Sequence, residues 1–277
     1  MGADQDSINR LIDAALEEDI GQGDLTSAAT LGEDTRLNLV MATREDISVA
    51  GLDIAEQIFR RLAPEANIQS LVSDGDRVSC GALLMTLEGP ARGLLSAERS
   101  ALNIVQMLSG IATETRRYVD AIDGTGAVLL DTRKTIPGLR ALSKYATRMG
   151  GATNHRMRLD DGVLIKDNHI VVTGSVANAV ELSKKAGLKN IEVECDTLDQ
   201  VVEALDAGTD KILLDNMNND QLRSAVEVTA GRIPLEASGG VNLATVRAIA
   251  ETGVNFISVG RITQSSPAVD IGLDLNA

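Results

Sequence analysis

The pattern of hydrophobic and polar positions changes near Gly126. Before this residue, apolar side chains recur at helical spacing in residues 7–18, 53–62 and 96–122, and they alternate with polar ones over residues 36–42. A spacing of three to four residues is typical of an amphipathic helix, whereas strict alternation is typical of a half-exposed strand. The first part of the chain therefore predicts a mixed α+β domain.

Two glycines mark local features of this first part. The sequence Ser-Asp-Gly-Asp at residues 73–76 lies between two short apolar runs and predicts a hairpin within residues 71–87. Gly110 lies inside the third helical segment, where a glycine lowers helix stability. We therefore expect that helix to be broken near Gly110.

After Gly126 the chain consists of short, apolar, β-branched runs separated by helical patterns. Continuous apolar strands that alternate with helices predict a parallel sheet covered on its outer side. From Glu194 onward the strand ends are 21, 23 and 22 residues apart, a regular strand–helix period. The pattern favours an incomplete parallel α/β barrel over a doubly wound open sheet. The six predicted strand ends are Asp131, Lys166, Glu194, Asp215, Ser238 and Gly260.

The change of pattern also predicts the domain organisation. At 277 residues the chain is long enough for one large barrel or for two modest domains. We expect an N-terminal α/β sandwich domain in residues 1–112 and an α/β barrel domain, with the active site, in residues 113–277. The first helix and the C-terminal tail are expected to pack with either domain.

Composition narrows the classes of function. The formal net charge of −14 argues against nucleic acid or an anionic membrane as a partner, because both repel an acidic surface. Two tyrosines, two phenylalanines and no tryptophan leave few aromatic platforms for stacking on single-stranded bases. No apolar stretch approaches the length of a membrane span. Cys80 and Cys195 stand far apart and outside metal-ligand spacing, so we expect two buried thiols in a cytoplasmic protein.

One segment departs from this acidic background. Residues 131–169 contain eight Lys/Arg against four Asp/Glu, and both histidines of the chain. Cations gathered within an acidic protein predict an anion pocket. The C-terminal ends of barrel strands face one mouth, so cations near the first strand ends would meet there and could bind carboxylates. These residues are Arg133, Lys134, His155, Arg156 and Lys166.

The later strand ends carry different chemistry. Glu194 and Asp215 could bind Mg²⁺ or accept hydrogen bonds from ribose hydroxyls, or they could simply neutralise neighbouring lysines. Glycines that follow a strand and precede a helix let backbone N–H groups approach a phosphate. The sequence alone therefore predicts a ligand with carboxylates at one end and phosphates at the other, together with a metal ion. The residues assigned to phosphate are Ser238, Gly239, Gly240 and Gly260.

These motifs, in this order, resemble those of the quinolinate phosphoribosyltransferase family, over essentially the full chain. The resemblance implies a glycosyltransferase of NAD (pyridine nucleotide) biosynthesis. Such an enzyme converts quinolinate and phosphoribosyl pyrophosphate into nicotinate mononucleotide, pyrophosphate and CO₂, with Mg²⁺. The matching segments are EDIGQGDLTS, DGDRVSCG, GPARGLLSAERSALNIVQMLSGIAT, DTRKTIPGLRALSKYATRMGG, NHR, LIKDNH, IEVE, ILLDN, EASGG and ISVG.

The resemblance also implies an N-terminal sandwich beside an incomplete barrel, in a homodimer or a hexamer built from dimers. Active sites would be shared between subunits, with Arg99 reaching into the partner's site. The implied catalytic residues are Lys134, Lys166, Glu194 and Asp215, and the last two would also serve the metal. The implied substrate-binding residues are Arg99, Thr132, Arg133, Lys134, His155, Arg156, Lys166, Glu194, Asp215, Ser238, Gly239, Gly240 and Gly260.

Three departures from the family's pattern and three rival functions accompany this interpretation. The departures are Ile136, Met157-Arg158 and Arg261, and none removes a residue assigned to chemistry.

A Schiff-base aldolase is the first rival function, and it would use Lys166 as its nucleophile. A phosphoribosyltransferase for nicotinate or another ring acid is disfavoured by the many cations, which suit a dicarboxylate. A non-catalytic sensor of phosphate ligands is disfavoured because every expected chemical residue is present.

Overall fold

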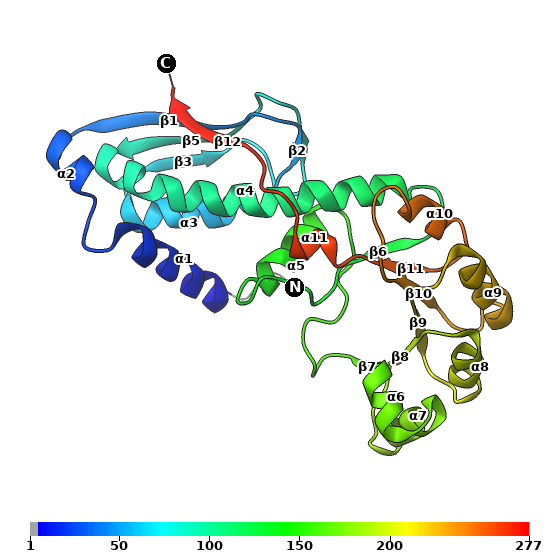
Figure 1. Ribbon diagram of the computed structural model, residues 1–277. Helices are drawn as coiled ribbons and strands as arrows, with labels where there is room; N and C mark the ends of the chain where they lie inside the picture. The colour runs from blue at the N-terminus through cyan, green and yellow to red at the C-terminus, as the bar shows by residue number, and fades with distance from the viewer. Residues whose placement is uncertain (1–4, 277) are drawn as a thin grey trace. The chain divides into compact units, whose positions relative to one another are not determined.

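The computed structural model describes residues 5–276, which form two compact units (Figure 1). Unit 1 comprises the described residues up to Arg116, Ile136–Gly151 and the segment from Ser265 onward, and unit 2 comprises Arg117–Thr135 and Ala152–Gln264. The sequence predicted one boundary, after residue 112, and left open which domain the first helix and the C-terminal tail would join. Both join unit 1, and so does the segment Ile136–Gly151, which the sequence had placed in the second domain, because it contributes side chains to the hydrophobic core of unit 1.

Unit 1 contains a four-stranded antiparallel sheet with the strand order β12-β1-β5-β3. Burial alternates along β1, as the sequence predicted, because every second side chain faces the core. Helices α3 and α4 cover one face of this sheet (Figure 1). The elements are α1 (Gln5–Ile20), α2 (Leu25–Thr30), β1 (Arg36–Thr43), β2 (Ile47–Ser48), α3 (Leu52–Leu62), β3 (Asn67–Ser70), β4 (Arg77–Val78), β5 (Leu83–Pro90), α4 (Ala91–Ala121), α5 (Arg140–Met149) and β12 (Ile271–Leu275).

The predicted hairpin within residues 71–87 is present only in part. The chain does fold back on itself, because β3 pairs antiparallel with β5 and the Leu71 backbone N–H donates to the Leu84 carbonyl (2.9 Å). The Ser-Asp-Gly-Asp turn does not join these strands directly, because β4 follows it and pairs with β2. The reason is Asp74, whose carboxylate accepts hydrogen bonds from the backbone N–H groups of Gly51 (2.7 Å) and Leu52 (3.1 Å). These bonds tie the turn to the start of α3, so the turn does not join β3 to β5 directly.

The predicted break near Gly110 is wrong, because α4 runs without interruption from Ala91 to Ala121. Gly110 is buried, and a Cβ atom there would lie 2.1 Å from the carbonyl oxygen of Pro267. The glycine therefore allows the C-terminal segment to approach the helix closely.

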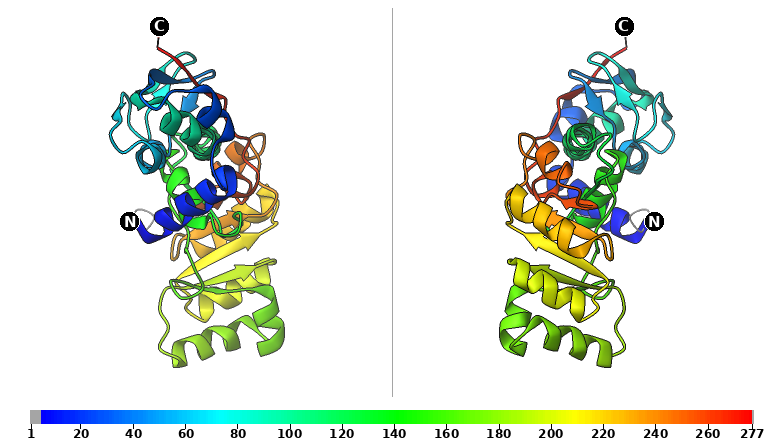
Figure 2. Two further views of the ribbon diagram at one scale, coloured as in Figure 1. Left: turned by 90° about the vertical axis from the view of Figure 1, so that its left-hand side faces the viewer. Right: turned by 90° about the vertical axis from the view of Figure 1, so that its right-hand side faces the viewer.

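Unit 2 contains a six-stranded parallel sheet with the order β6-β11-β10-β9-β8-β7, and all six predicted strands are present. Helices α8, α9 and α10 lie on the same side of this sheet (Figure 1), in front of the strands in the right-hand view of Figure 2. The elements are β6 (Val128–Leu130), β7 (Val163–Ile165), α6 (Asp167–Thr173), α7 (Val176–Lys185), β8 (Ile191–Cys195), α8 (Leu198–Asp206), β9 (Lys211–Asp215), α9 (Asn219–Thr229), β10 (Leu235–Ser238), α10 (Val246–Ala250), β11 (Phe256–Ser258) and α11 (Arg261–Gln264).

The sheet does not close into a full barrel within residues 5–276. Its edge strands β6 and β7 do not pair with each other, and an isolated bridge joins Leu130 to Thr153 in the connection between them. The predicted incomplete barrel is therefore confirmed. The turns after β8 and β9 are short, because Thr197 and Asn218 begin the next helices with capping boxes.

Side chains of the central strands alternate between the outer helices and the inside of the sheet. Val193, Cys195 and Ile212, for example, join the core shared with the helices. Cys195 is thus buried as predicted, whereas the prediction is wrong for Cys80, which is exposed just after β4.

The inward positions form three layers, which the strand register sets. Glu192 lies opposite Lys211 in the lower layer, Glu194 and Glu236 lie on either side of Leu213 in the middle layer, and Ser238 lies opposite Asp215 in the upper layer, at the strand ends. Along the described chain, no helix combines the length and apolarity that crossing a membrane requires.

We predict that Gly110→Ala destabilises the protein by about 1–3 kcal/mol, the usual range for overpacking a buried site. The added methyl group would overlap the Pro267 carbonyl oxygen. The same substitution in an exposed helix stabilises it by about 1 kcal/mol, so the sign of the effect is diagnostic. Denaturant unfolding measures it, with Asn103→Ala on the exposed face of α4 as the control. An increased stability of Gly110→Ala would contradict the close approach.

Candidate active site

A cavity of about 520 Å³ opens at the C-terminal ends of the strands in unit 2. The sequence predicted thirteen site residues, and this cavity is lined by every one of them except Arg99. The structure therefore brings together residues that lie up to 128 positions apart in the sequence. The predicted residues that line the cavity are Thr132, Arg133, Lys134, His155, Arg156, Lys166, Glu194, Asp215, Ser238, Gly239, Gly240 and Gly260.

Arg99 and two of the departures lie elsewhere or at the margin. Arg99 is exposed on α4 in unit 1. Ile136 is 47 % exposed and does not line the cavity. Arg261 does line the cavity, directly after Gly260, with an exposed side chain.

The loop after β6 is fixed by hydrogen bonds on both sides of Lys134. The hydroxyl of Thr132 accepts a hydrogen bond from the Lys134 backbone N–H (3.0 Å), and the hydroxyl of Thr263 donates to the Lys134 carbonyl (2.7 Å). Gly260 packs against the stem of Lys134, since a Cβ there would lie 2.8 Å from the lysine Cδ. The ammonium group is thus carried into the cavity by an anchored backbone.

A second anchor holds the Asn154-His155 segment. Asp131, which is fully buried at the end of β6, accepts hydrogen bonds from the His155 backbone N–H (2.9 Å) and from the Asn154 side-chain amide. Buried charge-assisted bonds of this kind are among the stronger protein hydrogen bonds. Asp131 therefore links the ends of two successive cationic segments.

The segment after His155 forms a closed turn. The carboxylate of Asp161 accepts hydrogen bonds from the backbone N–H groups of Met157 (2.7 Å) and Arg158 (3.0 Å). The guanidinium of Arg156 donates to the carbonyl of Gly162 (2.9 Å), across the same turn. The Met157-Arg158 departure is thus accommodated within the turn, and it leaves Arg156 at the cavity.

The two arginines of the cationic end lie close enough to influence each other. Burial, and then the charge of Arg133, lower the pKa of the Arg156 guanidinium. Two like charges held together are unfavourable, and at Arg156 the carboxylates of Glu192 and Asp161 oppose this effect. An anionic ligand between them would relieve this repulsion, so the pair suits a ligand with more than one negative charge.

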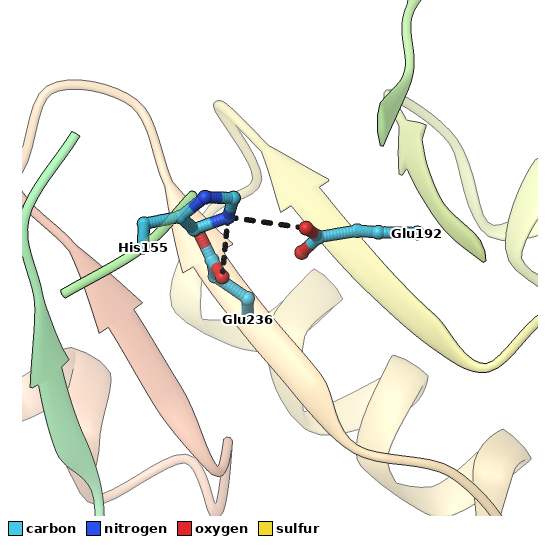
Figure 3. Close-up of side chains that lie close together, drawn as sticks. All are labelled: His155, Glu192 and Glu236. Atoms are coloured by element: carbon cyan, nitrogen blue, oxygen red, sulfur yellow. Dashed lines mark hydrogen bonds and ion pairs between the residues drawn. The ribbon is translucent and has the colours of Figure 1, made fainter. Parts of the chain in front are cut away.

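The imidazole of His155 points toward two carboxylates that come from β8 and β10 (Figure 3). Its Nε2 lies 3.1 Å from Glu192 and 3.5 Å from Glu236. Burial lowers the pKa of His155, but hydrogen bonds and charge from these carboxylates outweigh it and raise the pKa to about 9. The backbone N–H of Arg156 donates to the other nitrogen, Nδ1 (2.8 Å), which opposes a second proton there. Nε2, which faces the two carboxylates, therefore carries a proton whether the ring is neutral or charged.

The trio His155, Glu192 and Glu236 has the spacing of a metal site, with its ligand atoms within 4.8 Å of one another. Lys211, however, already supplies a cation there. Its ammonium group forms ion pairs with both Glu236 and Glu192, the latter at 3.2 Å. A metal ion would have to displace this ammonium, so the trio is better described as part of a four-residue charge network.

The acidic end of the cavity offers oxygen ligands beside lysines. Glu194 forms an ion pair with Lys166. Burial, and then the charge of Asp196, raise the pKa of the Asp215 carboxyl, while Lys166 and Lys134 lower it. A partly desolvated carboxylate near another carboxylate is stabilised by a divalent cation, and hard oxygen donors are what Mg²⁺ prefers. The residues present therefore fit Mg²⁺.

The glycine turn after β10 is shaped by Asn216. This residue has a left-handed backbone (φ 54°), donates from its amide to Asp215 (2.6 Å), and bonds through its N–H to the Ser238 carbonyl (3.0 Å). A Cβ at Gly239 (φ 92°) would lie 2.2 Å from the Asn216 side-chain oxygen, whereas Gly240 (φ 64°) faces open space. Both positions need glycine, and the turn leaves backbone exposed to a ligand.

Several residues that build the site were missed in the sequence. They are Asp131, Glu192, Lys211, Asn216 and Glu236. A usable signal was present for two of them, because Glu192 and Glu236 stand two residues before the predicted strand ends Glu194 and Ser238. Side chains two apart on a strand share a face, so these carboxylates had to point inward as well.

The comparisons with known proteins agree over the whole chain. The model described as quinolinate phosphoribosyl transferase, C-terminal domain, matches residues 111–274, and the model for the N-terminal domain matches residues 24–109. A probable nicotinate-nucleotide pyrophosphorylase (carboxylating) of Bacillus subtilis is 44% identical over 272 residues, which cover 97% of this chain and 93% of that protein. A nicotinate-nucleotide pyrophosphorylase (carboxylating) of Mycobacterium leprae is 43% identical over 280 residues, 99% of this chain and 97% of that protein.

A solved structure is similar to the same extent. The nicotinate-nucleotide pyrophosphorylase from Francisella tularensis matches with a TM-score of 0.94 at 41% identity, and the match covers 98% of this chain and 96% of that one.

Proposed function

The chain belongs to the quinolinate phosphoribosyltransferase family, and from this premise we propose how its cavity performs the reaction. The protein is a decarboxylating phosphoribosyltransferase of NAD biosynthesis. It transfers the phosphoribosyl group of phosphoribosyl pyrophosphate to quinolinate, giving nicotinate mononucleotide, pyrophosphate and CO₂. The observation that supports this best is one cavity with a cationic end and a glycine–carboxylate end.

We assign the cationic end to quinolinate. The guanidinium groups of Arg133 and Arg156 would each bind a carboxylate in a two-pronged geometry. Lys134 would complete the charge, the ring of His155 would line the site, and Thr132 would hold the loop that carries Lys134. The effect of the Arg133 charge on the pKa of Arg156 supports this assignment, because it places the two groups close together.

We assign the acidic end to the phosphoribosyl group. Glu194 and Asp215 would accept hydrogen bonds from the ribose hydroxyls and hold Mg²⁺, and Lys166 would lie between the two substrates. The chemistry that Mg²⁺ supplies when bound is neutralisation of the leaving diphosphate. Phosphate would be bound by the backbone of the glycine turns. The residues with this role are Ser238, Gly239, Gly240 and Gly260.

The chemistry needs no protein nucleophile. The bond between ribosyl C1 and the diphosphate breaks as the pyridine nitrogen bonds to C1, and the carboxylates of Glu194 and Asp215 would stabilise the positive charge on the sugar. The ring cation then stabilises the electron pair left when the adjacent carboxylate departs as CO₂, and that ring carbon takes up one proton. Holding two anions together contributes much of the rate. Lys166 needs no role as a Schiff base, and its ammonium is ion-paired with Glu194.

A spectrophotometric assay tests this function directly. We expect purified protein to form nicotinate mononucleotide from quinolinate, phosphoribosyl pyrophosphate and Mg²⁺. Nicotinate in place of quinolinate is the control, because it lacks the second carboxylate. Turnover of nicotinate with no turnover of quinolinate would overturn the assignment.

We predict that Arg133→Ala weakens quinolinate binding by about 2–4 kcal/mol, the range for removing one partner of a desolvated charge pair. Phosphoribosyl pyrophosphate should bind nearly as before, because its site uses other strand ends. Titration calorimetry measures both affinities. The matched control is Arg158→Ala, an exposed arginine that pairs with Asp160. Unchanged quinolinate affinity in Arg133→Ala would count against the assignment.

We further propose that the protein works in the cytoplasm as a homodimer, or as a hexamer built from dimers, with Arg99 completing the partner's site. The exposed position of Arg99 in unit 1 supports this. Arg99→Ala and Lys134→Ala should each be inactive. A dimer that contains one subunit of each kind would keep one intact site, so random mixing should restore about one quarter of native activity. No recovery after verified subunit exchange would refute the shared site.

A further inference from the structure

A layer of ionisable side chains lies inside the sheet of unit 2, below the cavity. Glu236 is fully buried, Glu192 is 6 % exposed, and Lys211 is half-buried. The inside of an α/β barrel is usually filled by branched aliphatic residues. Removing ionised groups from water is costly, and well-packed apolar residues are often at least as stabilising as a buried ion pair. Stability therefore gives no reason for this layer.

The layer is connected step by step to the substrate cavity. Lys211 pairs with Oε2 of Glu236, and this same oxygen lies 3.5 Å from Nε2 of His155. The other oxygen of Glu236, Oε1, has no hydrogen-bond partner among residues 5–276. One carboxylate oxygen thus joins the lysine to the histidine. The imidazole then accepts the backbone N–H of Arg156 at Nδ1 (2.8 Å).

Glu192 provides the second support for the ring. Its Oε2 lies 3.1 Å from Nε2 of His155, and its Oε1 forms an ion pair with Lys211 at 3.2 Å without hydrogen-bond alignment. The Lys211 ammonium also lies 4.7 Å from the centre of the Phe256 ring, which limits its freedom. Glu192 and Glu236 therefore both hold the imidazole of His155, and the ammonium group of Lys211 fixes the spacing between their carboxylates.

We propose that Glu236, Glu192 and Lys211 are positioning residues for quinolinate, which orient the imidazole of His155 and, through it, the backbone of Arg156. This inference rests on the proposed function. Lys211 has a second task in the proposal. Glu236 forms part of the cavity wall, and the lysine offsets negative charge that would otherwise repel a dicarboxylate.

Charge-changing variants separate this role from a merely structural one. Lys211→Met should raise the quinolinate KM by on the order of 10- to 100-fold, as for other residues that orient a ligand-binding histidine. The KM for phosphoribosyl pyrophosphate should change by less than about threefold, because its site lies nearer the strand ends. Adding Glu236→Gln to Lys211→Met restores the charge of the network, so the double variant should recover part of the loss. A purely structural role predicts additive losses.

A second measurement needs no activity, because the chain has two histidines. In protein labelled with ¹⁵N-histidine, His155 should show an Nε2 proton that exchanges slowly with water, and the spectrum of His169→Asn assigns the signals. Glu236→Gln should shift the ring signals of His155. The matched control is Glu251→Gln, an exposed glutamate paired with Arg247, which should leave them unchanged.

The outcomes distinguish this inference from the proposed function. If the native protein does not turn over quinolinate, the function fails, and the ring signals still report whether the network holds His155. If native turnover is present, an unchanged quinolinate KM in the folded Lys211→Met variant, or unchanged His155 signals in Glu236→Gln, overturns the positioning role. Thermal unfolding verifies the fold of each variant. If either single variant does not fold, the charge-balanced double variant carries both measurements. It should still show a raised quinolinate KM and shifted His155 signals, and an unchanged KM or unchanged signals would overturn the role.

Discussion

The alternation of side chains along parallel strands is the constraint on which the rest of unit 2 depends. A strand that buries one face against helices must direct its other side chains inward, and neighbouring strands in register align these side chains in layers. In unit 2 the outward set is apolar and joins the helical core, whereas the inward positions of β8, β9 and β10, apart from Leu213, are charged or polar. Glu194 and Asp215, nearer the strand ends, line the cavity, and Glu192 and Lys211 lie deeper in the sheet, beneath it.

This arrangement explains how a strongly acidic protein can bind an anion. The net charge of −14 acts over the whole surface and is screened by salt. The cavity is governed instead by groups within a few ångströms, where Arg133, Lys134 and Arg156 outweigh the distant acids. Asp131 shows the local cost of such a site, since a fully buried carboxylate is needed to hold the segment that carries His155.

Much of the fold and site could be predicted from the sequence, because their signals are local. Each strand of unit 2 is a short apolar run in the sequence. The end of each run could therefore be located, and the polar residues at these ends could be assigned to the site. The errors came from contacts that are distant in sequence. The turn at Asp74 is hydrogen-bonded to the start of α3. Gly110 is needed because the chain at Pro267, 157 positions away, approaches it closely. A glycine needed for close approach has no local signature that distinguishes it from a helix breaker.

The buried carboxylates also follow from the electrostatics of the cavity. Two arginines and a lysine gathered in one partly desolvated place repel one another, and the group would be unstable without compensating negative charge. The compensating carboxylates cannot lie on the cavity side of these cations, because the substrate must approach from that side. It has to come from behind, from the inside of the sheet, and the inward positions of β8 and β10 are the ones that reach His155 (Figure 3). Two carboxylates there would overcompensate and repel a dicarboxylate, and the ammonium of Lys211 between them reduces that excess. A charged interior layer is therefore a consequence of placing a dicarboxylate site at the mouth of this sheet.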